Sequence, residues 1–141
     1  MLLIDKSDKY KLILITVILD IFLLLLYFDK TTHLNNFDKN FIRSMGFIHL
    51  LLYWTLYNND RYSILYYLHL TLIISILFGM VLENMPLKFA ILALLSLIQI
   101  LWVLENKCIM GKFGYNKILT ISTIIYYGLL SLRVGYEWGQ A

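Results

Sequence analysis

The chain has 141 residues, of which 60% are hydrophobic and 15% are charged, and it carries a net charge of +3. Soluble domains carry about 25% charged residues, so this composition, with a mean hydropathy of +0.73, excludes an ordinary soluble domain. The lysines and arginines are scattered in ones and twos, which argues against nucleic-acid binding, and the single cysteine, Cys108, excludes an internal disulfide or a thiolate metal cluster.

Long apolar runs separated by short polar connections dominate the sequence. A helix needs roughly 20 apolar residues to cross a bilayer, and the runs lack the alternation that is typical of barrel strands. The sequence therefore predicts an all-α, polytopic transmembrane helix bundle with four or five spans and short loops, forming a single transmembrane domain over residues 1–141. The predicted spans are residues 12–28, 41–57, 63–82, 89–104 and 118–132.

The first predicted span, residues 12–28, also resembles a signal peptide in its position. It is longer than the usual apolar region of a signal peptide, it contains Asp20, and no small-residue cleavage site follows it. We therefore expect a retained helix.

Asp20 is the strongest candidate for a functional residue, because an acidic side chain near the middle of a span costs about 2.5–3.5 kcal/mol on insertion scales. It needs a partner, and His49 of the second span, or less closely His69 of the third, lies at a similar depth. Such a pair would clip two helices together, relay protons or hold an ion. We favour the clip, since one Asp and one His make a poor metal site.

The second predicted span, residues 41–57, is the weakest because it contains Arg43 and His49. It either crosses the membrane or lies at its surface. If it crosses, the N-terminal side holds seven of the twelve Lys and Arg residues, which favours a cytoplasmic N-terminus. If it does not cross, the count becomes five against seven, so the sequence leaves the orientation open.

Tyrosines and tryptophans lie on both sides of the polar turn at residues 58–61, between the second and third spans. Their rings are apolar and their tips are polar, so they prefer the depth of the lipid headgroups. We interpret them as an aromatic belt rather than as a ligand site.

Small and polar residues recur along the later spans and predict helix packing. Ser75 and Gly79 lie four residues apart on the third span, and Thr123, Ser131 and Gly135 follow one face of the fifth. Such stripes allow helices to approach closely and to form hydrogen bonds. Gln99 of the fourth span is expected either to join these contacts or to line a polar cavity.

The four letters VLEN occur at residues 81–84 and again at 103–106, which places Glu83 and Glu105 at the two ends of the fourth span. A helix of that length separates them by roughly 24 Å or more, so the two carboxylates do not share one site. Between the third and fourth spans we expect a tight turn, with Asn84 as a left-handed cap of the third span and Pro86 at the start of the next helix. Lys88 is expected to snorkel.

The connection after the first span contains Asp29, His33 and Asp38, which suggest cation binding only weakly. Their spacing matches no calcium loop or zinc motif. We expect a solvated loop.

Catalytic signatures such as a nucleophile elbow, a phosphate-binding loop or a zinc-protease motif are absent from the sequence. We therefore expect a non-enzymatic protein without a cofactor or metal. The favoured function is a small multi-pass structural or accessory subunit whose partners are the lipid bilayer and other membrane subunits or further copies of itself. The alternatives are a transporter, channel or proton-relay protein using Asp20 with His49 or His69, and, with less support, a lipid-modifying enzyme.

Overall fold

The computed structural model describes residues 6–58, 62–105 and 117–141, without the side chains of residues 6–7, 62–66, 69, 105 and 117–119. These ranges contain helices and no strands, which confirms the all-helical class. The elements are α1 (Lys6–Phe28), α2 (Asn36–Asn58), α3 (Tyr62–Leu77), a 3-10 helix η1 (Phe78–Met80), α4 (Met85–Glu105) and α5 (Lys117–Gln140).

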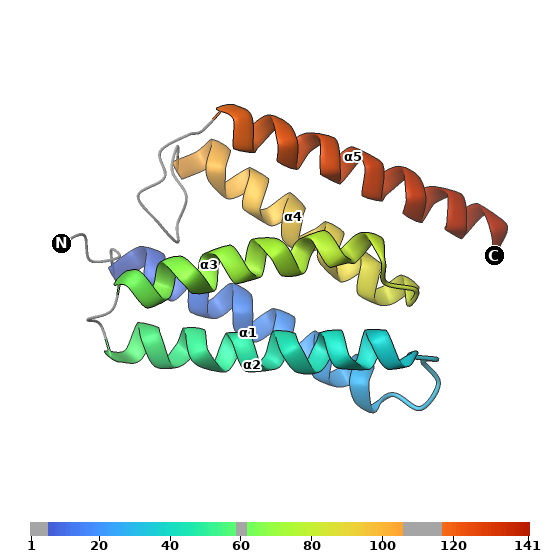
Figure 1. Cartoon of the computed structure of the whole chain (residues 1–141), viewed down its shortest axis with the longest axis horizontal. Helices are drawn as coiled ribbons and strands as arrows, with labels where there is room; N and C mark the ends of the chain where they lie inside the picture. Colours follow the sequence, from blue (N-terminus) through green and yellow to red (C-terminus); the bar gives the residue numbers. More distant parts are fainter. Residues whose placement is uncertain (1–5, 59–61, 106–116) are drawn as a thin grey trace.

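The helices run roughly side by side along the long axis of the molecule, and consecutive helices point in opposite directions (Figure 1). α2 packs against α1 and α3, whereas α4 packs against α1 and α5. The connection between α1 and α2, the turn before α4 and the C-terminus therefore lie at the same end of the bundle, on the right of Figure 1. We call this end the loop end.

Each of the five predicted spans coincides with a helix, but the third predicted span, residues 63–82, extends beyond the end of its helix. α3 ends at Leu77, and the chain tightens into η1 before it leaves the helix. The carbonyl of Phe78 accepts hydrogen bonds from the peptide N–H groups of both Val81 and Leu82, which closes this last turn. Residues 81–82 are thus not helical.

Within the described parts of the chain, two helical stretches are long and apolar enough to cross a membrane, Asp8–Phe28 in α1 and Met85–Leu104 in α4. Leu70–Met80 is apolar but shorter. By length and composition alone, these two stretches give weak support to a membrane location.

The core lies between the helices and is built almost entirely of aliphatic side chains. Leu52, Leu82, Leu87 and Leu130 are completely buried, and Met45 is 1% exposed. Because burial of one such side chain contributes about 1.5–3 kcal/mol relative to exposure in water, these residues fix the positions of α2, α4 and α5 in the bundle.

Asparagine side chains cap the N-termini of two helices at the loop end. The Oδ1 atom of Asn35 accepts the N–H of Asp38 at 2.7 Å, and Oδ1 of Asn84 accepts the N–H of Leu87 at 3.0 Å. Such caps stabilise a helix by about 1 kcal/mol. Asn84 therefore caps the start of α4 instead of the end of the preceding helix, which corrects the expectation, while Pro86 lies in the first turn of α4 as predicted.

Candidate functional site

The structure brings Asp20 of α1 into contact with two side chains of α2. Nδ1 of His49 lies 2.5 Å from Oδ1 of Asp20, and the hydroxyl of Tyr53 donates a hydrogen bond to Oδ2 at 2.6 Å. The His49 side chain is only 2% exposed, and that of Asp20 is 24% exposed. Both carboxylate oxygens of Asp20 are thus engaged. His69 lies on α3, but its side chain is outside the described residues.

Tyr53 is a member of this network that the sequence analysis missed, because it was assigned to the aromatic belt. His49 and Tyr53 are four residues apart on α2, and side chains at this spacing share one face of a helix. The spacing of four residues between His49 and Tyr53 is therefore the signal in the sequence that indicates this contact.

The contacts of Asp20 are of a kind that joins two helices. Hydrogen bonds to a charged group contribute about 1.5–3 kcal/mol each when they are shielded from water. The contact also places two ionisable side chains within hydrogen-bond distance of each other, which is the geometry that a proton relay requires. Among the described residues, no three His, Cys, Asp or Glu side chains are grouped closely enough to hold a metal ion.

A cavity of about 220 Å³ lies beside His49. Side chains from all five helices line this cavity, including Thr16 of α1, Leu72 of α3, Ile98 of α4 and Tyr126 of α5. Most of the lining is aliphatic. The cavity is therefore an apolar space, in contrast to the Asp20 network that borders it.

The two glycines that were predicted to allow close helix packing, Gly79 and Gly135, differ in how closely other atoms approach them. Gly79 is buried at a close approach, since an added Cβ would lie 3.0 Å from Cγ2 of Ile91 and 3.1 Å from the hydroxyl of Tyr126. By contrast, an added Cβ at Gly135, which is exposed, meets nothing within 4 Å. The described residues therefore give no support to the predicted packing of Gly135 against another helix of the bundle.

The hydroxyl residues of the predicted packing stripes are satisfied mainly within their own helices. Ser75 donates to the carbonyl of Thr71, and Ser131 donates to the carbonyl of Tyr127, at 2.8 and 2.7 Å. Thr123 lines the apolar cavity. These hydrogen bonds of Ser75 and Ser131 thus remain within one helix.

Gln99 of α4 is half-buried, and its Nε2 atom is fully buried without a hydrogen-bond partner. It does not line the cavity. A buried donor without an acceptor costs about 1–3 kcal/mol. The predicted polar contacts of Gln99 are therefore not made by its Nε2 atom in the described structure.

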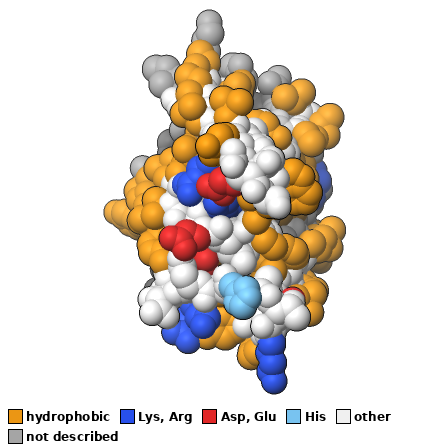
Figure 2. Space-filling model, turned by 90° about the vertical axis from the view of Figure 1, so that its right-hand side faces the viewer, with side chains coloured by type: hydrophobic (Ala, Val, Ile, Leu, Met, Phe, Trp, Pro, Cys, Tyr) orange, Lys and Arg blue, Asp and Glu red, His pale blue; other side chains and the backbone are white. Residues whose placement is uncertain are grey.

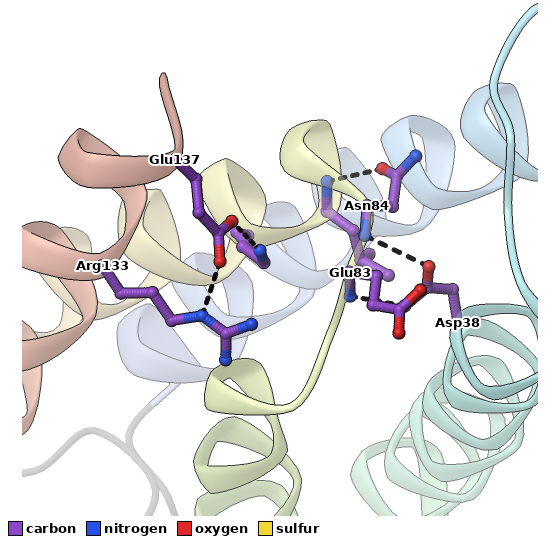
Figure 3. Close-up of polar contacts among 7 residues, drawn as sticks. Asp38, Glu83, Asn84, Arg133 and Glu137 are labelled. Atoms are coloured by element: carbon purple, nitrogen blue, oxygen red, sulfur yellow. Dashed lines mark hydrogen bonds and ion pairs between the residues drawn. The ribbon is translucent and has the colours of Figure 1, made fainter. Parts of the chain in front are cut away.

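The loop end carries an ion-pair cluster that sequence analysis did not predict (Figure 3). Nζ of Lys88 on α4 donates to Oε2 of Glu137 on α5, and Nε of Arg133 donates to Oε1 of the same glutamate at 2.7 Å. The Lys88 side chain is 1% exposed. The expectation that Lys88 snorkels was wrong, because α5 supplies a carboxylate that neutralises the lysine where it is buried.

The hydrogen bond from Lys88 and, after it, the one from Arg133 lower the pKa of Glu137 below its ordinary value of 4.5. Glu137 therefore stays ionised over a wider range of pH than a free glutamate does.

Asp38 was assigned to a solvated loop, and this assignment was wrong. It lies in the first turn of α2, is completely buried, and accepts the peptide N–H groups of Glu83 and Asn84 at 3.2 and 3.1 Å (Figure 3). The physical reason is that the peptide N–H groups of Glu83 and Asn84, in the partly buried turn before α4, need an acceptor. His33, in contrast, is exposed.

Viewed from the loop end, positive and negative side chains lie together in the middle of the face, further basic side chains lie at its lower edge, and hydrophobic side chains line its flanks (Figure 2). Glu83 is exposed at this end, at the start of the turn into α4. Glu105 is the last residue of α4. A helix of this length separates its two ends by roughly 30 Å, so the two glutamates do not form a common site.

Comparison of the chain with protein-family models, with curated proteins and with solved structures finds no match. Three features of the chain itself therefore bear on its function: the Asp20–His49–Tyr53 network, the apolar cavity, and the ion-pair cluster at the loop end.

Proposed function

We propose that this protein is a multi-pass integral membrane protein. The observation that carries the proposal is the apolar surface of α1, where Leu14, Ile18, Ile21 and Leu25 follow one helical face and are each 55–67% exposed. Soluble monomers rarely expose a contiguous apolar patch larger than a few hundred Å². Lipid chains cover such a face without the cost that contact with water imposes.

The positions of polar groups on α2 support its crossing as well. His49 is turned inward to Asp20, and Arg43, one turn and a half closer to the loop end, contacts the hydroxyl of Tyr27 at 2.6 Å through Nη2. Long basic side chains near the end of a span reach the membrane surface in this way. The polar residues of α2 are thus compatible with a transmembrane helix.

Within the membrane, we propose the role of a non-enzymatic structural or accessory subunit. Both carboxylate oxygens of Asp20 contact side chains of the bundle, and the neighbouring cavity is apolar. α5 also presents an outward apolar face, on which Ile125, Leu129 and Leu132 are each more than half exposed. These features support contacts with lipid and with other membrane helices rather than chemistry on a substrate.

The experiment is isolation of the tagged full chain from its native membrane in a mild detergent, followed by determination of the mass of the complex and identification of its components. We expect a stoichiometric partner or a defined oligomer. A folded monomer that carries no partner would contradict the role of a subunit, although it would leave the membrane location intact.

The contact between Asp20 and His49 favours a second candidate function, a proton relay or ion-conducting protein. Proton flux into liposomes that contain the purified chain tests it, with Asp20→Asn as the variant that removes the ionisable group. A flux that Asp20→Asn abolishes would support this alternative. Correctly folded protein without flux would remove it.

A further inference from the structure

The cavity beside His49 has a wall that suits hydrocarbon. The residues that α3 and α4 contribute to it include Leu72, Ile73, Leu94 and Ile98. We propose that this cavity binds one hydrocarbon chain of a membrane lipid. The inference rests on the membrane location proposed above, but not on the role of a subunit.

Three polar side chains in the wall already have hydrogen-bond partners within the protein. Oγ1 of Thr16 donates to the carbonyl of Leu12 at 2.9 Å, and the hydroxyl of Tyr126 donates to the carbonyl of Ile76 at 2.6 Å. Nδ1 of His49 is engaged by Asp20. Because these three groups already have partners and most of the remaining wall is aliphatic, a ligand binds mainly through apolar contact.

The volume of the cavity limits the size of an apolar ligand that it can hold. An apolar cavity of about 150 Å³ in another protein holds benzene, so about 220 Å³ accommodates a segment of one flexible chain. A helix from a partner protein has a diameter of about 10–12 Å with its side chains, which the cavity does not admit. A hydrocarbon chain fits, and a bilayer supplies such chains at high concentration.

The cavity also has access to the outer surface of the bundle. Leu77 of α3 and Ser122 of α5 line it, and both residues are exposed. The exposed fraction of Leu77 is 53%. In a membrane, lipid chains would surround these residues, so a chain enters from the bilayer without passing through water.

Trp102 of α4 lines the cavity and provides a probe within the site. The two other tryptophans, Trp54 and Trp138, are 49% and 66% exposed, and their replacement by Phe leaves Trp102 as the only indole. Phosphatidylcholine with a dibrominated acyl chain is titrated into this variant in detergent micelles. We expect quenching of Trp102 that saturates at one lipid per chain.

A matched pair of variants locates the binding site. Ile73→Phe with Ile98→Phe narrows the cavity and is expected to weaken binding at least fivefold, as read from the titration midpoint. Ile74→Phe with Ile100→Phe makes the same chemical change on outward faces of the same helices and is expected to leave the midpoint unchanged.

Quenching that rises without saturation, or an equal weakening in both double variants, would overturn the proposal. If the narrowed variant does not elute as folded protein, Ile98→Phe alone is compared with Ile100→Phe in the same titration. Because the measurement is made on the isolated chain in micelles, its outcome is independent of whether a partner subunit co-purifies.

Discussion

Lys88 of α4 and Glu137 of α5 form an ion pair in which the lysine side chain is 1% exposed and the glutamate side chain 28% exposed. The pair joins the first turn of α4 to the last turns of α5. A buried ammonium group without a counter-ion is strongly unfavourable, so the glutamate neutralises a charge that α4 places inside the bundle.

Glu137→Gln is therefore expected to destabilise the protein by about 2–3 kcal/mol, somewhat less than the loss of one partner of a fully buried pair. Thermal unfolding in detergent, followed by circular dichroism, measures the effect. Arg133→Gln is the control, because Arg133 contacts the same glutamate from a side chain that is 34% exposed. It is expected to cost less than about 1 kcal/mol. Equal losses would contradict a special role for the buried lysine.

Stability is expected to fall in acid in a way that depends on Glu137. The pKa of this group is lower in the folded protein than its ordinary value of 4.5, so the folded state binds fewer protons than the unfolded state. The stabilisation is complete above about pH 4.5 and is lost as the pH falls through the folded pKa. Melting temperatures from pH 7 to pH 3 test this, and Glu137→Gln is expected to flatten the acid limb. An unchanged acid limb in the variant would refute the assignment.

Gly79→Ala is expected to destabilise the bundle by about 1–3 kcal/mol, because the new methyl group forces Ile91 or Tyr126 to move. Gly128→Ala is the matched control on α5, where an added Cβ meets nothing within 4 Å. It is expected to stabilise by about 0.5–1 kcal/mol through the higher helix propensity of alanine. Melting temperatures that shift in the same direction for both variants would argue against the close approach at Gly79.

Gln99→Leu is expected to raise the stability of the isolated chain by about 1 kcal/mol, because it removes a buried donor without a partner. Thermal unfolding of the monomer in detergent measures the change. Gln140→Leu, at the exposed end of α5, is expected to have no effect. A loss of stability in Gln99→Leu would mean that the amide has a partner that stabilises the chain.

The helices were accessible from the sequence because they depend on local patterns, and the Asp20–His49 contact was accessible because both residues lie at similar positions within neighbouring apolar runs. Long apolar runs define the helices, and the depth of a polar residue within a run selects a partner at the same depth. The same reasoning did not reveal Tyr53, since abundant tyrosines near the span borders favour the interpretation as a belt.

The contacts of Asp38 and Lys88 were not predictable because they join residues that are more than 40 positions apart. Asp38 bonds the peptide group of Glu83, and Lys88 bonds Glu137. Which acidic residue faces which donor depends on the packing of whole helices, and nothing in the local sequence distinguishes Asp38 from a solvated aspartate. The end of α3 was misplaced for a related reason, since apolar residues continue beyond the helix into η1 and the buried turn.

Cysteine accessibility tests the proposed crossing of a bilayer by all five helices. In a Cys108→Ser background, single cysteines at His33, Glu83 and Ala141 mark the loop end, and one at Asn58 marks the opposite end; all four positions are exposed.

An impermeant maleimide is applied to sealed membrane vesicles of one orientation. If all five helices cross, we expect the three loop-end cysteines to react from the same side and the cysteine at position 58 to react only from the other. Labelling of positions 33, 58 and 83 from one side would contradict the crossing of α2 and α3, and with it the multi-pass bundle.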